Sequence, residues 1–212
     1  MKKDGAQPQS EVFYTVEEYL SFDKASELRN EYMAGQIVAM TGASREHNLV
    51  NSNVSRELNT QLRGKPCETY SNDMRVETKA PDYYYPDTVV VCGEPQLIKP
   101  EGVDTLLNPT VIIEVLSKSS EADDRGGKFI EYRTLLSLKD YILISQNKMR
   151  VEHYARQPDD KWTLVEDASS GDQTIRIESI NCELSLADIH ERVEFPPRPG
   201  QLRRVSDETP PQ

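Results

Sequence analysis

The sequence predicts an α+β fold in which helices cover both faces of a central mixed sheet. Two apolar, β-rich segments, residues 88–92 and 110–116, lie near the middle of the chain. The second segment is too apolar for a half-exposed strand, so we expect it at the centre of the sheet. A long segment with helical spacing precedes both, and several alternating segments follow them. Together these patterns predict an α/β/α core.

Length and composition fit one large domain better than two. The chain has 212 residues, of which 36% are hydrophobic, and this is enough apolar material for a core if the polar ends are tails. We expect residues 1–11 to form a disordered leader and residues 12–195 to form the domain. Residues 196–212 are Pro-rich and charged, which predicts a disordered tail.

Charge and cysteine content exclude several classes of protein. The formal net charge of -11 argues against a broad basic surface, so a polyanion would be contacted locally or through a metal. Cys67, Cys92 and Cys182 show no paired spacing that indicates a disulfide framework or a zinc site. No apolar run reaches the length of a membrane span, and residues 1–10 contain no signal-peptide core. A soluble protein in the reducing cytoplasm is therefore expected.

The amino-terminal part of the domain is predicted to begin with a helix and a hairpin. Thr15 and Glu18 have the spacing of a capping box and open a short helix that ends near Leu20. Residues 28–33 and 36–40 are separated by a glycine-containing turn and read as the two strands of a β-hairpin. Glu31 lies in the first of these strands.

After the hairpin, apolar residues recur at helical spacing, and this pattern defines the next element. It predicts an amphipathic helix over residues 44–63, ended by Gly64, whose apolar face contains Val50, Val54, Leu58 and Leu62. His47 lies in the first turn of this helix, and residues 67–71 and 73–78 follow as short strands. Residues 82–85 lead into the strand at 88–92, and residues 93–108 are expected to form a loop.

The carboxyl-terminal half alternates a helix with further strands. Residues 121–136 are predicted to form one helix with Phe129, Tyr132 and Leu136 on one face. A buried strand follows at residues 141–145, and an antiparallel meander is predicted at residues 149–155, 162–166 and 174–177. Ser185 is expected to cap a last short helix.

Two carboxylates stand out because they interrupt apolar strands. Asp87 opens the first of these strands, and Glu114 lies within the second. On the second strand, Glu114 shares one face with Ile112 and Leu116. A buried carboxylate costs free energy unless it is paired or binds a metal. The alternatives are turn chemistry after a proline for Asp87, and neutralisation by a buried basic side chain for Glu114.

The order of these elements and acids resembles the PD-(D/E)XK nuclease superfamily, whose fold is that of the type II restriction endonucleases. The match is closest to the Uma-two family, whose members are regarded as bacterial endonucleases. It rests on four ordered segments, which are residues 85–92, 114–117, 124–132 and 140–143. The hairpin at residues 31–40 and His47 also fit, so that the resemblance covers roughly residues 14–193.

The resemblance implies a metal-dependent hydrolase. Cleavage of a phosphodiester needs an activated water and stabilisation of charge on the phosphate oxygens. Mg²⁺ provides both when one or two carboxylates hold it and water positions stay open, and Mn²⁺ can substitute for it. Asp87 and Glu114 would be the ligands, together with the backbone carbonyl of Val115.

The superfamily pattern also implies a lysine two residues after the strand glutamate, where this chain has Leu116. In the family that it resembles, the lysine has moved to the following helix, which here offers Lys128. Lys128 also has Asp124 four residues before it, so a surface ion pair is the competing interpretation. Lys118 has the right strand parity but lies past the expected end of the strand.

The resemblance also adds weaker site candidates. Glu31 would be a third acid, and His47 near a helix N-terminus could meet a phosphate. Asp73 and Arg75 would flank the site, and Tyr132 belongs to the matching helix. Tyrosines at residues 83–85 are candidates for stacking on bases, although tyrosines in strands more often pack in the core.

Two functions from different classes follow from these residues. The first is a metal-dependent endonuclease acting on DNA, expected by analogy to be a homodimer. The second is a catalytically inactive nuclease fold that serves as a binding or assembly module. Leu116 in the place of a lysine and the acidic net charge favour the second function.

Overall fold

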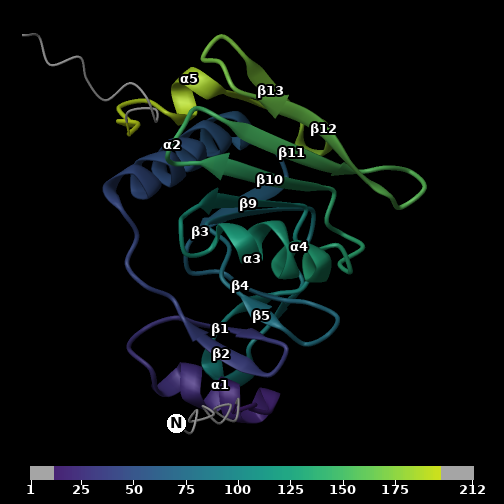
Figure 1. The fold of residues 1–212 in the computed structure, drawn as a ribbon. Helices are drawn as coiled ribbons and strands as arrows, with labels where there is room; N and C mark the ends of the chain where they lie inside the picture. The colour runs from purple at the N-terminus through teal and green to yellow at the C-terminus, as the bar shows by residue number, and fades with distance from the viewer. Residues whose placement is uncertain (1–11, 197–212) are drawn as a thin grey trace, which may run out of the picture.

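Two six-stranded sheets and a two-stranded sheet carry the fold in the computed structural model, which describes residues 12–196 (Figure 1). The leader predicted at residues 1–11 and residues 197–212 of the predicted tail lie outside the described residues. The helices are α1 (Val16–Ala25), α2 (Arg45–Leu62), α3 (Glu121–Arg125), α4 (Gly127–Tyr132) and α5 (Leu186–Ile189).

The central sheet contains the strands that carry the site. In spatial order its strands are β12 (Trp162–Ala168), β11 (Val151–Arg156), β10 (Asp140–Ser145), β9 (Val111–Leu116), β6 (Thr88–Cys92) and β3 (Cys67–Ser71). β9 and β10 are parallel and the other neighbours are antiparallel. The central sheet is therefore mixed, and the predicted fold class is confirmed.

Two smaller sheets flank the central one. The second six-stranded sheet has the order β2 (Gln36–Ala39), β1 (Asn30–Met33), β5 (Tyr83–Tyr84), β4 (Arg75–Glu77), β8 (Thr105–Leu106) and β7 (Leu97–Ile98). The two-stranded sheet pairs β13 (Thr174–Ile177) with β14 (Cys182–Ser185). In Figure 1 the hairpin of β1 and β2 lies with α1 at one end of the molecule, and β13 and α5 lie at the other.

Alternation along β9 divides the core into two layers. Ile113 and Val115 pack with the apolar face of α2, which presents Val50, Val54, Leu58 and Leu62. Ile112 and Leu116 face the other way, into a cluster that includes Tyr132 of α4. Helices therefore cover opposite faces of the sheet, as the alternation of β9 and the helical spacing of α2 predict.

Side-chain caps fix where the first two helices begin. Thr15 accepts a hydrogen bond from the backbone N–H of Glu18, and the Glu18 carboxylate accepts one from the N–H of Thr15, so the predicted capping box forms. Ser44 caps α2 by accepting a hydrogen bond from the N–H of His47 at 3.1 Å. This cap sets the position of His47 in the first turn of α2.

Three predicted elements differ in the structure. The helix predicted over residues 121–136 breaks at Gly126, where an added Cβ would meet the Ala122 carbonyl oxygen at 2.9 Å. Leu136 lies beyond α4 and is 63% exposed, because the apolar spacing continues past the helix end. The segment at residues 93–108 contains β7 and β8, and β13 pairs with β14 instead of extending the meander.

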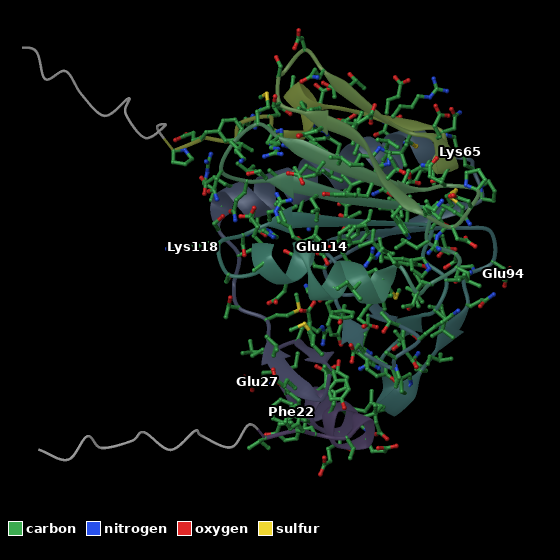
Figure 2. All side chains as sticks on the ribbon, turned by 45° about the vertical axis from the view of Figure 1, so that its right-hand side comes forward. Phe22, Glu27, Lys65, Glu94, Glu114 and Lys118 are labelled. Carbon is green, nitrogen blue, oxygen red and sulfur yellow. A yellow bond between two sulfur atoms is a disulfide. The ribbon has the colours of Figure 1, made fainter. Side chains whose placement is uncertain are left out.

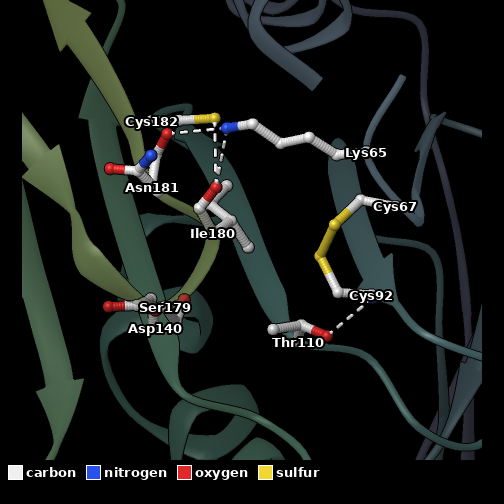
Figure 3. Close-up of a disulfide and its surroundings, with 9 residues drawn as sticks. All are labelled: Lys65, Cys67, Cys92, Thr110, Asp140, Ser179, Ile180, Asn181 and Cys182. Atoms are coloured by element: carbon white, nitrogen blue, oxygen red, sulfur yellow. Dashed lines mark hydrogen bonds between the residues drawn. A yellow bond between two sulfur atoms is a disulfide. The ribbon is translucent and has the colours of Figure 1, made fainter. Parts of the chain in front are cut away.

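The expectation that no disulfide forms is wrong, because Cys67 and Cys92 are bonded (Figure 3). These residues are direct partners in the antiparallel register of β3 and β6, with their Cα atoms 4.0 Å apart. The separation of 25 residues gives no spacing signal, so only the strand pairing brings the two sulfurs together. Cys182 is buried and not disulfide-bonded.

The described residues include no helix with both the length and the apolar character needed to cross a lipid bilayer.

A buried histidine links three neighbouring elements of the central sheet. His153 on β11 contacts the Asp140 carboxylate through Nε2 at 2.7 Å and the Glu166 carboxylate through Nδ1 at 3.2 Å. Asp140 also accepts a hydrogen bond from Ser179. Burial lowers the pKa of His153, but hydrogen bonds and charges from Asp140 and Glu166 outweigh burial and raise this pKa.

We predict that the protein loses stability as His153 deprotonates. A histidine whose folded-state pKa is raised contributes stability below its unfolded pKa of about 6.5, and this contribution is lost as pH rises through the folded pKa. His153→Gln should therefore lower the free energy of unfolding by about 1–3 kcal/mol near pH 6 and by less near pH 8. Urea unfolding at the two pH values measures the difference. An equal loss at both would contradict a charged His153.

Candidate active site

The antiparallel register of β6 and β9 brings the two strand carboxylates together. Thr88 pairs with Ile113 and Val89 with Ile112, so the same register places Asp87 opposite Glu114 at the end of the paired region. Both side chains come from the face that also carries Leu116. The two acids that the sequence singles out therefore occupy one site, which lies between the central sheet and the helices α3 and α4 (Figure 2).

Backbone groups hold this pair in place. Asp87 accepts a hydrogen bond from the N–H of Val115 through Oδ2 at 2.7 Å, and Glu114 accepts one from the N–H of Asp87 through Oε2 at 3.2 Å. The Asp87 Oδ1 atom has no hydrogen-bond partner within residues 12–196, and the Asp87 side chain is 14% exposed. One carboxylate oxygen thus remains available at the opening of a mostly buried site.

Lys128 is the cation of the site. Its Nζ atom lies 2.9 Å from Glu31 Oε1, 3.3 Å from Asp124 Oδ1 and 3.7 Å from Glu114 Oε1. The Lys128 side chain is only 7% exposed, so the surface ion pair considered for Lys128 and Asp124 is in fact buried. Lys128 lies one turn before Tyr132, the last residue of α4, and its buried ammonium extends from there toward the sheet.

Burial and mutual charge shift the pKa values of Glu31, Glu114, Asp124 and Lys128. Burial raises the pKa of Glu114 well above its usual range, and Lys128 opposes this shift. Burial also raises the pKa of Glu31 and of Asp124, again against the charge of Lys128. Burial alone would lower the pKa of Lys128, but the surrounding carboxylates raise it well above its usual range. The lysine therefore stays charged.

Asp124 is the site residue that sequence reasoning treated only as a partner for Lys128. It is 1% exposed, and its Oδ1 atom is among the buried polar atoms without a hydrogen bond. Its spacing of four residues from Lys128 was the available signal, since i and i+4 residues share a helix face. What the spacing could not reveal is that this face is turned toward Glu114.

His47 reaches the pair from the opposite side of the sheet. Its Nε2 atom lies 3.2 Å from Asp87 Oδ2, and its Nδ1 atom is buried without a hydrogen-bond partner. Burial disfavours the charged imidazolium, but the hydrogen bond and charge of Asp87 outweigh burial and raise the pKa of His47. The first turn of α2 thereby forms one wall of the site.

The donor set suits a hard divalent cation. Asp87, Glu114, Asp124 and Glu31 supply four negative charges when ionised, against one positive charge from Lys128 and a second from protonated His47. Burial is the main cause of the raised pKa values of Glu31, Glu114 and Asp124, and neighbouring carboxylates raise them further. A bound divalent cation would favour the ionised forms of these acids. Oxygen ligands are those that Mg²⁺ prefers.

The structure offers two carboxylates for such an ion, and side chains of the described residues do not complete its coordination shell. Within residues 12–196, no group of three or more His, Cys, Asp or Glu side chains is arranged to bind a metal. Mg²⁺ sites in phosphoryl-transfer enzymes commonly use one or two carboxylates, with water and substrate oxygens completing the shell. The adjacent carboxylates of Asp87 and Glu114 are of the number and type that such a site uses.

Several weaker candidates lie elsewhere. Arg75 is completely buried and forms an ion pair with Asp23 at 3.1 Å. It therefore neutralises Asp23 beneath the hairpin. Asp73 is exposed and pairs with Arg29 at 3.3 Å. Arg75 therefore pairs with an acid outside the site, and Asp73 pairs with a base outside it. Lys118 is exposed, forms no salt bridge with any described residue, and lies at the edge of the molecule in Figure 2.

The tyrosines of the site are structural in the conformation seen. Tyr132 is fully buried and donates a hydrogen bond to Glu114 Oε1 at 3.3 Å. The tyrosines at residues 83–85 are 4%, 1% and 1% exposed, so they cannot stack on bases. The backbone N–H of Tyr85 instead donates to Glu31 Oε1 at 3.2 Å and fixes that carboxylate beside Lys128.

Comparison with known proteins gives consistent matches over most of the chain. The model of the Uma2 family, described as "Putative restriction endonuclease", matches residues 16–188. Two Synechocystis sp. proteins, both named as uncharacterized, are similar in sequence. One, sll1609, is 36% identical over 153 residues, which cover 72% of this chain and 86% of the relative. The other, slr1290, is 31% identical over 180 residues, which cover 84% and 92%.

A solved structure shares the fold. It is a crystal structure from Anabaena variabilis described as "a putative nuclease belonging to DUF820". The match covers 78% of this chain and 91% of the other, with a TM-score of 0.64 and 18% sequence identity. At this identity the likeness establishes the fold alone, which agrees with the restriction-endonuclease-like arrangement described above.

We predict that removing the charge of Lys128 destabilises the protein through its carboxylate neighbours. Lys128→Met keeps most of the side-chain volume but leaves Glu31, Asp124 and Glu114 without their cation, which should cost about 3–5 kcal/mol. Adding Glu31→Gln to this variant should restore part of the loss. Urea unfolding measures both, and Lys148→Met, at an exposed lysine, is the matched control. A Lys128→Met variant as stable as the control would refute a buried ionic cluster.

Proposed function

Because the chain belongs to the Uma2 family of restriction-endonuclease-like nucleases, we propose that it is a metal-dependent endonuclease that hydrolyses phosphodiester bonds in DNA. The family resemblance predicted from the ordered motifs is confirmed by the family match over residues 16–188. The observation that carries the proposal is the free Oδ1 atom of Asp87 beside Glu114, in a group of four carboxylates that Lys128 only partly neutralises.

In this proposal, Asp87, Glu114 and the Val115 carbonyl hold a divalent cation, with Mg²⁺ as the natural ion and Mn²⁺ as a substitute. Such an ion activates a bound water and neutralises charge on phosphate oxygens. The remaining chemistry belongs to the side chains. The hydrogen bonds from the N–H groups of Val115 and Asp87 orient the two carboxylates, so that little reorganisation is needed when substrate binds.

Lys128 takes the role that the superfamily pattern gives to a lysine at position 116. Leu116 packs into the apolar cluster below the site, whereas the Nζ atom of Lys128 lies 3.7 Å from Glu114 Oε1. Its charge opposes the effect of burial and favours the ionised form of the carboxylates, and its ammonium is the proposed stabiliser of charge that develops on the phosphate. Glu31 positions this ammonium through its 2.9 Å contact.

A second candidate function is a catalytically inactive binding or assembly module. The observation in its favour is that the ion pairs of Lys128 lie inside the protein, with Glu31, Asp124 and Glu114. A lysine engaged in this way would need to exchange a partner to contact substrate. Absence of any metal-dependent cleavage by well-folded protein would favour this second function.

Cleavage assays distinguish the two functions. Supercoiled, linear duplex and single-stranded DNA are incubated with the protein in Mn²⁺, in Mg²⁺ and in chelator. We expect cleavage that depends on the metal and falls at least about 100-fold in Glu114→Gln, because a ligand is lost. Glu94→Gln, at an exposed acid far from Glu114 (Figure 2), should cleave like the wild type. Equal activity in both variants would point to a contaminating nuclease.

We also propose that the active protein is a cytoplasmic homodimer, in which two sites address the two strands of DNA. This rests on the resemblance to nucleases of this fold and on the prevalence of two-fold symmetric oligomers. Light scattering at micromolar concentration should give twice the mass of one chain. A single-chain mass under conditions that support cleavage would argue for a monomeric enzyme.

A further inference from the structure

A polar trough opens beside the acid pair, and none of its lining residues takes part in the proposed hydrolysis. We propose that it binds the sugar-phosphate backbone of the nucleic acid strand next to the cleaved bond, without regard to base sequence. This inference rests on the proposed nuclease function, because it extends the same site. The trough has a volume of about 620 Å³, within the range of pockets that hold small ligands.

The trough is built along the exposed face of α2 and the end of β3. All of its lining residues except Leu49 are of polar types, although their carbon atoms contribute much of the lining surface, and they include Arg45, Asn48, Ser52, Ser55, Ser71 and Asn72. Hydroxyl and amide groups, an arginine and the first turn of a helix are groups that contact phosphate and sugar in nucleic-acid complexes. No aromatic side chain lines the trough, so it offers no platform for stacking of bases.

Hydrogen bonds connect the trough to the site. The backbone N–H of Asn72 donates to the carbonyl oxygen of Asp87 at 3.0 Å. The Asn51 side chain accepts from Thr88 Oγ1 at 2.7 Å and donates to Asn72 Oδ1 at 2.6 Å. His47, one residue before Asn48, contacts Asp87 at 3.2 Å. A strand whose phosphate reaches Asp87 would therefore continue into the trough.

Several donors of the trough are available to a ligand. The Ser52 hydroxyl and the Asn72 amide nitrogen donate to no acceptor within residues 12–196. Arg45 is exposed and uses one N–H in a 3.3 Å contact with Glu46. Asn72 has a positive φ of 61°, a conformation that asparagine tolerates and that turns its side chain toward α2.

The trough carries little positive charge, which predicts how its affinity for DNA depends on salt. Arg45 is the one basic residue in its lining, in a chain of net charge -11. Binding through neutral donors releases few counterions, whereas each phosphate neutralised by an arginine contributes about 0.7–0.9 to the salt slope. We therefore expect a shallow dependence of affinity on salt, most of which disappears when Arg45 loses its charge.

The test measures binding without cleavage. Fluorescence anisotropy with labelled DNA of several sequences is recorded in chelator over a range of salt concentrations. Arg45→Gln should lower the slope of log affinity against log salt by about 0.7–0.9. Ser52→Ala with Asn72→Gly should weaken binding at least about tenfold at an unchanged slope, because neutral donors are lost. All sequences should respond alike, since only backbone contacts are removed.

Matched controls lie at the other end of α2. Arg63→Gln and Asn59→Ala replace an exposed arginine and an exposed asparagine outside the trough, and both should bind like the wild type. Circular dichroism verifies that each variant is folded. If the trough variants bind DNA as tightly as these controls, the trough does not hold the strand.

The result is separable from the proposed function. If the wild type cleaves DNA while the trough variants bind and cleave normally, the inference fails and the nuclease proposal stands. If the wild type binds DNA through the trough but cleaves none in any metal, the nuclease proposal fails and a binding module remains. If it neither binds nor cleaves, both fail.

Discussion

The buried ammonium of Lys128 is the interaction on which the acidic site depends. Three carboxylates within 3.7 Å of it, on Glu31, Asp124 and Glu114, would repel one another without a cation between them. Burial of so many acids is costly, and the raised pKa values of Glu31, Glu114 and Asp124 record that cost. One lysine offsets this cost only in part, so a further positive charge would be stabilised at the site.

Side chains from three separate elements meet at Lys128, and a second buried network supports the hairpin among them. The hairpin brings Glu31, and the N–H of Tyr85 fixes the Glu31 carboxylate. Tyr85 in turn donates to Asp23, which the buried Arg75 neutralises. This second ionic pair explains why Arg75 lies under the hairpin and not in the site. The two buried networks therefore make the position of the hairpin, and so of Glu31, part of the site's geometry.

The same sheet end serves both the acids and the trough. Asp87 presents its carboxylate toward His47 and Val115, and its carbonyl oxygen toward Asn72. Residues on α2 thereby divide between two tasks, with His47 at the carboxylates and Asn48 and Ser52 along the trough. In the proposed function, a chain of net charge -11 binds a polyanion through a cation at the acids and neutral donors beside them.

The sequence by itself determined the features that depend on local periodicity. Alternation along residues 111–116 assigned Glu114 to the face of Leu116, helical spacing defined the buried face of α2, and the capping box at Thr15 placed the start of α1. The ordered motifs identified the family and selected Asp87 and Glu114. They also favoured Lys128 over Lys118 as the replacement for the missing lysine, and the structure places Lys128 Nζ 3.7 Å from Glu114 Oε1.

Only the tertiary structure decided the contacts between distant segments. Lys128 meets Glu31 across 97 residues, Cys67 bonds Cys92 through the register of β3 and β6, and Asn72 joins Asp87 beside α2. Strand register and the crossing of helices over a sheet are set by packing of the whole core, so no local pattern encodes them. For the same reason the burial of Asp124 could not be foreseen from its spacing to Lys128. That spacing fixes which residues share a helix face but not what the face packs against.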